Sequence, residues 1–245
     1  MENTNTVELL DYMGSDKSHA LSAWASTFFD LGVDLPKNPK MRVDQIVDYI
    51  LNKSKRMRGV EDLLRYLANE NHESPFRMSS FMFGMTTDIS THIQKLKHAV
   101  ILEAENAESA KYKELKEDKF YIPEDWAYFN IEDVSMLNKY NCHTYEQLLF
   151  QKSNELNEIY HACLKDGRKY LGDKRAKETS RFFKMYNSQI NSINKFSFAG
   201  IMTFYNKRTV DFAQEEIKSV AKAMVEQIKN IEGEPFKYSL KAFGL

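Results

Sequence analysis

Glycine and proline are scarce in this chain, and this scarcity constrains the fold more than any other feature of the sequence. Only nine glycines and five prolines occur among 245 residues. Because these two residues interrupt regular structure most strongly, we expect long helices in preference to many short strands. Neither an internal repeat nor a linker is visible, so we predict a single domain over residues 1–245.

Apolar periodicity predicts several amphipathic helices. The clearest runs from about Thr144 to Tyr170, with Thr144 as its N-cap and Gly172 as its stop. A second runs from about Asp211 to Ile231. Shorter helices are expected at about 16–31, 42–53 and 59–70.

Strands are fewer. Residues 7–12 and 76–85 have strand-like patterns, whereas 190–198 fits either a strand or a helix. The segment 103–118 is rich in Glu, Lys and Ala and favours a helix by propensity alone. Helices mixed with a few separated strands indicate an α+β fold.

Charge and composition exclude several classes of function. The formal net charge is −1, which argues against nucleic acid or an anionic membrane as the partner. Cys142 and Cys163 cannot build a disulfide framework or a zinc-binding CxxC pair, and we expect no metal. The N-terminal residues are polar, and the longest nearly apolar run, 196–205, is too short to cross a bilayer, so we expect a cytoplasmic protein.

One polar helix face is a candidate binding site. In a helix that begins near Ile89, the spacing of Gln94, Lys97 and His98 places all three on one face. An amide, a cation and an imidazole there suit a polar heterocycle or a phosphate. A solvated surface stripe is the alternative, and it is the more common case.

Two connections carry further candidates. Pro75 biases Ser74 toward an extended backbone, which could aim His72 or the Ser74 hydroxyl at a ligand. Ser109 and Lys111 offer a hydroxyl and a cation to a phosphate. Both segments are equally consistent with ordinary connections.

Arg181 and Arg208 stand among aromatic residues. Arg181 precedes Phe182 and Phe183, and Arg208 follows Phe204 and Tyr205. A guanidinium in such surroundings is either stacked and structural or directed at an anion, and the local sequence leaves both readings open. Arg208 also precedes the helix expected from Asp211, so it could share a role with that helix terminus.

Several segments, taken in order, resemble the flavin-dependent thymidylate synthases. The resemblance covers most of the chain. It is carried by Val7–Asp16 followed by Ser26, His72-Glu-Ser-Pro-Phe76, Gln94-Lys-Leu-Lys-His98, Asn106–Tyr112, Phe120-Tyr-Ile-Pro123, Arg181, and the helix that contains Met202, Asn206 and Arg208 and leads to Ala213–Ile217.

This resemblance implies a fold and an activity. The fold is a twisted, mainly antiparallel sheet flanked by helices, assembled as a homotetramer with active sites at subunit interfaces. The activity is a transferase reaction that methylates C5 of deoxyuridine monophosphate (dUMP). Methylenetetrahydrofolate supplies the carbon, and FAD, reduced by NADPH, supplies the hydride.

The resemblance also assigns roles to residues of this chain. Ser109, Lys111 and Arg181 would hold the nucleotide phosphate, with Gln94 near the nucleotide. Arg208 would polarise the pyrimidine and stabilise charge that develops on the ring. Residues placed by the flavin or folate are His72, Ser74, Lys97, His98 and Asn206.

The chain departs from the family pattern mostly where the cofactor would bind. The positions concerned carry Lys97 and Ala99 for two arginines, Ser197 and Ala199 for an asparagine and an arginine, Thr203 for an asparagine, and Phe212 for a histidine. These departures leave three readings: a methyltransferase with an altered flavin site, a hydroxymethylase acting on dUMP or the cytosine nucleotide dCMP, and an inactive nucleotide-binding or assembly protein.

Overall fold

A computed structural model describes residues 4–25, 42–53, 58–97 and 102–245. The chain divides into two compact units. The first unit comprises Met1–Thr6, Met85–Lys97 and Asn106–Ile193, and the second comprises Val7–Gly84, His98–Glu105 and Asn194–Leu245. Whether residues 1–245 act as one domain stays a prediction.

An antiparallel sheet runs through the chain, and it confirms the predicted α+β class. Its strands lie in the order β1-β2-β4-β3. On β2 the side chains of Phe81, Phe83 and Met85 are buried whereas Met82 is exposed, so helices cover one face of this strand. The bounds are β1 Thr6–Met13, β2 Ser80–Asp88, β3 Leu102–Ala107 and β4 Gln189–Phe196.

The second unit is built around aromatic side chains. Phe236 lies 4.8 Å from Phe81 and stacks on Phe198 at 5.9 Å between ring centroids. The amphipathic helix α9 buries Ile217, Met224 and other apolar residues of one stripe. The helices of this unit are α1 Asp16–Trp24, α3 Arg42–Lys53, α4 Val60–Asn69, the 3₁₀ turn η2 Ser74–Arg77, α8 Phe198–Arg208, α9 Glu215–Lys229 and α10 Lys237–Ala242.

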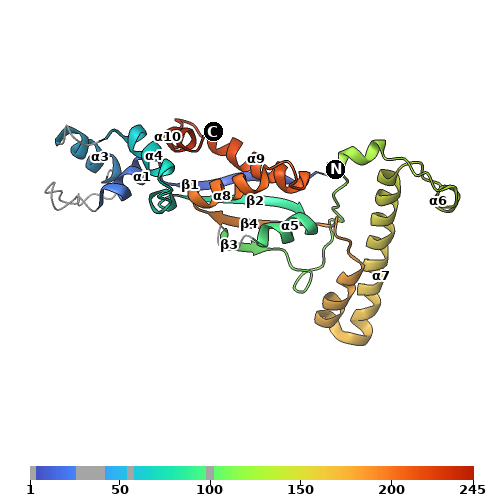
Figure 1. Ribbon diagram of the computed structural model, residues 1–245. Coiled ribbons are helices and arrows are strands. Elements are labelled where there is room, and N and C mark those ends of the chain that lie inside the picture. Colours follow the sequence, from blue (N-terminus) through green and yellow to red (C-terminus); the bar gives the residue numbers. More distant parts are fainter. Residues whose placement is uncertain (1–3, 26–41, 54–57, 98–101) are drawn as a thin grey trace. The chain divides into compact units, whose positions relative to one another are not determined.

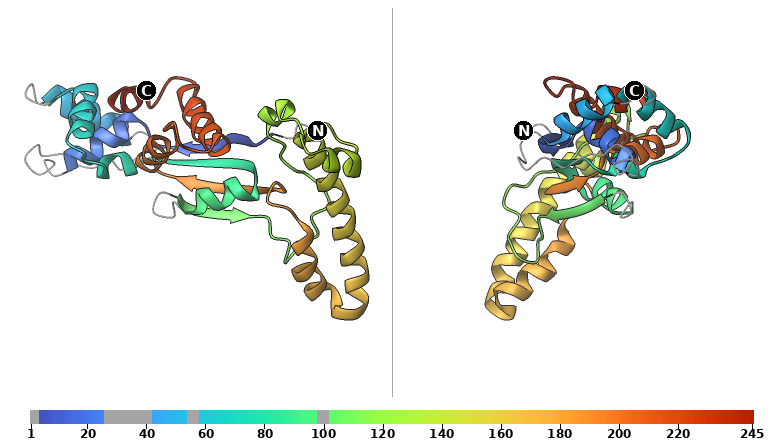
Figure 2. Two further views of the ribbon diagram at one scale, coloured as in Figure 1. Left: turned by 45° about the vertical axis from the view of Figure 1, so that its right-hand side comes forward. Right: turned by 90° about the vertical axis from the view of Figure 1, so that its left-hand side faces the viewer.

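The first unit contains a helical hairpin, which Figures 1 and 2 show as two antiparallel segments of α7. Thr144 caps the helix with a capping box, as predicted. Gly172, with φ 75°, breaks it, and the chain returns as a second helical segment that the sequence did not predict. Tyr160, Leu164 and Ala176 pack between the segments. The helices are α5 Ile89–Leu96, η3 Glu124–Tyr128, α6 Val134–Tyr140, α7 Tyr145–Ser180 and η4 Arg181–Phe183.

Three expectations about secondary structure are wrong. Residues 103–118 form β3 and a loop, because pairing in the sheet outweighs a weak helical propensity. Residues 76–77 belong to η2, because Pro75 starts a 3₁₀ turn and the strand begins only at Ser80. The last long helix starts at Glu215 and not at Asp211.

The other expected elements agree with the structure in type. The helix predicted at 42–53 is α3, that at 59–70 is α4, and the ambiguous segment 190–198 is largely strand β4. The helix expected at 16–31 is α1 as far as Trp24, and its remainder lies outside the described residues. Within the ranges that the structure describes, no helix combines the length and apolar composition needed to cross a bilayer.

Candidate active site

A tight turn over residues 109–113 carries two of the predicted phosphate ligands. The backbone oxygen of Ser109 accepts hydrogen bonds from the amides of Tyr112 at 3.0 Å and Lys113 at 3.1 Å. The Ser109 hydroxyl accepts from the Lys111 amide at 3.3 Å. Just before the turn, Glu108 exchanges hydrogen bonds with the backbone of Asn191 on β4, at 2.9 and 3.0 Å. The sheet therefore anchors the N-terminal side of this turn.

The 109–113 turn lies against the end of α7 that leads to the third predicted ligand. Lys111 Nζ is 3.9 Å from a carboxylate oxygen of Glu178, three residues before Arg181. Lys177 Nζ donates to the Tyr112 carbonyl at 3.4 Å. Arg181 closes the helix and is exposed. The structure thus brings Ser109 and Lys111 to the helix end at which Arg181 stands.

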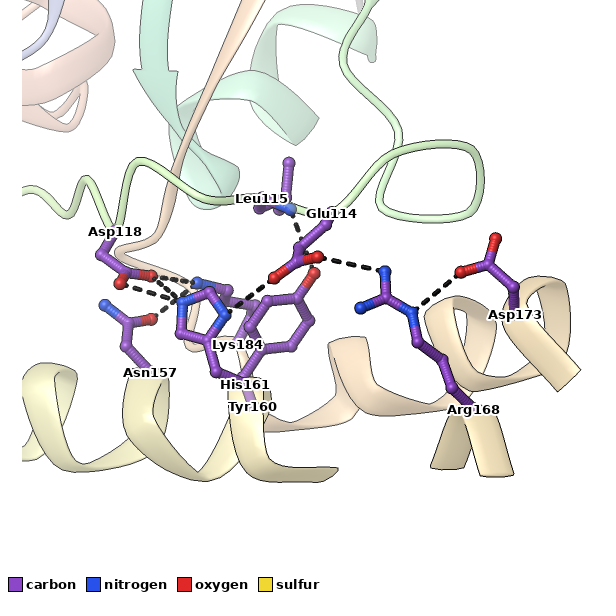
Figure 3. Close-up of polar contacts among 9 residues, drawn as sticks. All are labelled: Glu114, Leu115, Asp118, Asn157, Tyr160, His161, Arg168, Asp173 and Lys184. Carbon is purple, nitrogen blue, oxygen red and sulfur yellow. Dashed lines mark hydrogen bonds and ion pairs between the residues drawn. The ribbon is translucent and has the colours of Figure 1, made fainter. Parts of the chain in front are cut away.

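Beyond this turn lies a cluster of charged residues that sequence reasoning missed (Figure 3). We call it the charged cluster, and its members are Glu114, Asp118, His161, Arg168 and Lys184. His161 Nδ1 lies 3.3 Å from Glu114, and Nε2 lies 2.9 Å from Asp118. The partners are 43 to 66 positions apart in the sequence, so no local motif marks them.

Burial and ion pairing shift the pKa values of two members of the charged cluster, Lys184 and Glu114. Burial lowers the pKa of the Lys184 ammonium, although Asp118 acts in the opposite direction. For Glu114, burial acts to raise the pKa, but the contacts with Arg168 and His161 together outweigh it and leave the pKa of this carboxyl below its ordinary value. Glu114 is therefore held as a carboxylate at neutral pH.

The polar face expected on α5 can be followed only in part. Asp88 caps the helix by accepting from the Thr91 amide at 2.9 Å. Gln94 is half-buried and Lys97, the C-cap, is exposed. His98 lies outside the described residues. The shared face of these three residues stays a prediction.

In the second unit, Arg208 ends α8 with a buried, unpartnered donor. The guanidinium Nε of this half-buried side chain has no hydrogen-bond acceptor. A buried N–H of a charged group that lacks an acceptor destabilises the fold, and this N–H is free to donate to an oxygen of a ligand. The next helix starts only at Glu215, and whether Arg208 shares a role with its terminus stays a prediction.

The remaining candidates of the second unit are accessible. His72, Ser74 and Asn206 all have exposed side chains. Ser74 is the first residue of the 3₁₀ turn η2, so the extended conformation expected before Pro75 is wrong. The accessible side chains are available to a ligand, and no contact in the structure assigns one to them.

Four positions at which the family resemblance expects polar cofactor contacts present no free polar group. Ser197 is 0% exposed, and its hydroxyl caps α8 by accepting from the Gly200 amide. Ala199 is 2% exposed. The Thr203 hydroxyl donates to the Ala199 carbonyl at 2.9 Å, and Phe212 is an apolar ring with 92% of its surface exposed.

Metal-ligating side chains and the two cysteines are the remaining groups of interest among the described residues. No group of three or more His, Cys, Asp or Glu side chains among the described residues has the arrangement of a metal site. Cys142 is buried and its Sγ contacts Gln151 Oε1 at 3.1 Å, while Cys163 lies 3.4 Å from the Ser180 hydroxyl.

Relatives of this chain are known from sequence and from structure. A flavin-dependent thymidylate synthase of Thermosipho melanesiensis is 27% identical over 218 residues, covering 88% of this chain and 81% of the relative. A second, from Thermosipho africanus, is 26% identical over 245 residues, covering 97% of this chain and 90% of the relative.

A solved structure shares the fold. The UMP/dUMP methylase PolB of Streptomyces cacaoi, bound to 5-Br dUMP, is similar with a TM-score of 0.68 and 21% identity, covering 98% of this chain and 94% of PolB. The family model "Thymidylate synthase complementing protein" matches residues 8–232. The chain therefore belongs to this family, that of the flavin-dependent thymidylate synthases.

Proposed function

We propose that the protein transfers a one-carbon unit to C5 of a pyrimidine deoxynucleoside monophosphate of the dUMP type. Family membership supports this reaction, as do relatives that are themselves flavin-dependent thymidylate synthases. PolB, which shares the fold, is a UMP/dUMP methylase. In the proposed reaction C5 forms a bond to the methylene carbon of methylenetetrahydrofolate and loses its proton, while the bonds from that carbon to the folate nitrogens break and tetrahydrofolate leaves.

The 109–113 turn and the end of α7 supply the proposed phosphate site. Ser109 offers a hydroxyl, Lys111 an ammonium and Arg181 a planar guanidinium that matches phosphate oxygens in pairs. A carboxylate oxygen of Glu178 lies 3.9 Å from Lys111 Nζ, so a bound phosphate would compete with this carboxylate for the Lys111 ammonium. Gln94 is proposed to lie near the nucleotide.

The buried Nε of Arg208, which lacks an acceptor, is the observation that carries the chemical part of the proposal. As C5 becomes nucleophilic, negative charge grows on the oxygens of the pyrimidine ring. A guanidinium held away from water stabilises such charge more strongly than one in bulk solvent. Arg208 is thus the proposed catalytic residue, and a ring oxygen is the acceptor that its Nε lacks.

FAD does not fit this chain in the manner that the family resemblance implies. Of the α8 positions, Ser197 is the residue before the helix and is buried, Ala199 is buried, and the Thr203 hydroxyl donates its proton within the helix, so these positions offer a flavin no accessible side-chain donor. We therefore derive no step through FAD. The accessible His72, Ser74, Lys97 and Asn206, together with His98, remain proposed cofactor or folate contacts.

This loss of polar groups favours hydroxymethyl transfer as the second candidate. Methylation needs a hydride to reduce the transferred methylene, whereas hydroxymethylation needs water at the same step and no reductant. A site that lacks the expected flavin contacts is consistent with the second outcome. NADPH as reductant, the homotetramer with sites between subunits, and the cytoplasmic location stay predictions from the sequence.

The test is incubation of the protein with methylenetetrahydrofolate and either dUMP or dCMP, with and without FAD and NADPH. Mass spectrometry of the nucleotide then identifies the product. A methyl or hydroxymethyl group on the base supports the proposal and distinguishes its two forms. An unmodified base under all conditions, with nucleotide still bound, would leave the inactive binding protein as the correct reading.

A further inference from the structure

The loop that follows the 109–113 turn is bound to α7 by ion pairs as well as by apolar packing of Leu115 against Tyr160, Leu164 and Ala176. Glu114 accepts from Arg168 Nη2 at 3.1 Å, and Asp118 accepts from Lys184 Nζ at 3.1 Å. Between these ends, the Leu115 amide donates to the Tyr160 hydroxyl at 3.1 Å. Glu114 and Asp118 therefore each meet a cation of the helical hairpin or of the segment just after it.

His161 stands between the two carboxylates, as Figure 3 shows. Its two ring nitrogens point to different carboxylates, Nδ1 to Glu114 and Nε2 to Asp118. The other charged groups that face this site are Arg168 and Lys184. The Lys184 side chain is 5% exposed, and its Nζ lies 4.4 Å from the centre of the Tyr160 ring. His161 thus contacts a carboxylate at each end of the loop segment.

A row of ion pairs continues from the charged cluster back to the turn itself. Arg168 Nε donates to Asp173 at 2.9 Å, and Lys177 Nζ donates to the same carboxylate at 2.6 Å. Lys177 also donates to the Tyr112 carbonyl inside the turn. The path therefore links Glu114, through the hairpin, to the backbone beside Lys111.

We propose that the charged cluster is a latch that holds the 109–113 turn in its phosphate-binding conformation. The ligand in this inference rests on the proposed function, whereas the ordering of the turn does not. An exposed turn of five residues loses conformational entropy when it is fixed, and the contacts of its two flanks offset that loss. Glu108 fixes one flank to β4, and the charged cluster fixes the other to α7. Its members are positioning residues, because they are proposed to act on phosphate through Ser109 and Lys111.

The first experiment compares binding of dUMP with binding of deoxyuridine, which lacks the phosphate. In His161→Gln and Glu114→Gln the affinity for dUMP should fall about five- to tenfold, because the competent turn is populated for a smaller fraction of the time. The affinity for deoxyuridine should change less than about twofold. Arg168→Lys, which keeps the charge beside Glu114, should retain most of the dUMP affinity.

Lys169→Gln is the matched control, since Lys169 pairs with Asp166 on the same helix. It should leave both affinities unchanged. Equal losses for dUMP and deoxyuridine in the cluster variants would show a general structural role and overturn the latch. Unchanged dUMP affinity in both cluster variants would overturn it as well.

A second measurement needs no nucleotide. The amides of Lys111, Tyr112, Lys113 and Leu115 are hydrogen-bonded, so their hydrogen exchange reports the order of the turn. His161→Gln should speed their exchange about five- to tenfold relative to Lys169→Gln. If exchange changes but the unaltered protein binds no dUMP, the proposed function fails and the ordering stands. If exchange does not change, the latch fails even where the unaltered protein binds dUMP.

Discussion

Arg181 and Arg208 both stand at the C-terminal ends of helices, yet their surroundings differ. Arg181, at the end of α7, is exposed, and neighbouring cations of its unit are paired with carboxylates, as Lys111 is with Glu178. Arg208, at the end of α8, is half-buried and its Nε has no acceptor. A charge in water exchanges partners at little cost, whereas a buried charge without a partner is maintained at a cost to stability. The difference is consistent with the proposed roles, in which Arg181 binds the phosphate and Arg208 stabilises charge on the ring.

The largest effect is expected from Arg208→Ala. Removing a donor that stabilises charge in the transition state lowers turnover on the order of 100- to 1,000-fold. The fold should persist, because the variant deletes an unpartnered group, and circular dichroism and thermal unfolding should show this. Arg208→Lys keeps the charge but loses the planar fork and should recover only part of the rate. Full activity in Arg208→Ala would contradict the assignment.

Arg181→Ala should act mainly on binding. Loss of charge-assisted hydrogen bonds to phosphate weakens dUMP affinity about 10- to 100-fold, while turnover at saturating nucleotide changes little. Calorimetric titration measures the first quantity, and initial rates at high dUMP measure the second. A fall in turnover as large as that of Arg208→Ala would remove the distinction between the two arginines.

A buried histidine of the second unit predicts how the free energy of unfolding depends on pH. His19 is 0% exposed, with Ser79 and Ser239 hydroxyls each 2.8 Å from its ring nitrogens, and burial lowers its pKa to about 3. The unfolded chain binds a proton at this site near pH 6.5, so the stability due to neutral His19 is lost as the pH falls from about 6.5 toward 3. We expect a loss of about 2 kcal/mol between pH 7 and pH 5.

Urea unfolding at the two pH values measures this loss, and His19→Gln should lack most of it. Asp16 opposes the effect, because burial raises the pKa of its carboxyl and its protonation stabilises the fold at low pH. An equal pH dependence in the variant would contradict the role of His19.

The smallest effect is expected from an exposed ion pair on α7. Lys152 pairs with Glu155 one turn later, and the two side chains are 31% and 51% exposed. Lys152→Gln should change the free energy of unfolding by less than about 0.5 kcal/mol, because solvent screens the pair. A larger loss, measured by urea unfolding, would mean that exposed charges of the hairpin contribute more than the comparison assumes.

Elements with a strong local signal were predictable from the sequence. The helix at 42–53 has its predicted bounds, and Thr144 is the N-cap of α7 because its hydroxyl and Gln147 form a capping box. Residues 103–118 were not predictable in this way. Their composition favours a helix weakly, and pairing with a strand that lies more than 80 positions away decides their conformation.

The residues of the candidate site also fall into two groups, those that the sequence predicted and those that it did not. Resemblance pointed to Ser109, Lys111 and Arg181, and the structure brings the turn with the first two to the helix that ends at the third. The charged cluster had no such signal, because His161 meets Glu114 and Asp118 only after the chain has folded back on itself. Contacts between distant charged residues carry no periodicity, and only the fold reveals them.

A crystal structure of the protein with bound dUMP tests the central claim most directly, since that claim is that Arg181 and Arg208 serve one nucleotide. The account predicts that Arg181 and Lys111 hydrogen-bond the phosphate, and that an Arg208 guanidinium, from the same or a neighbouring copy, contacts an oxygen of the same molecule's pyrimidine ring. A bound nucleotide that reaches only one of the two guanidiniums would contradict it.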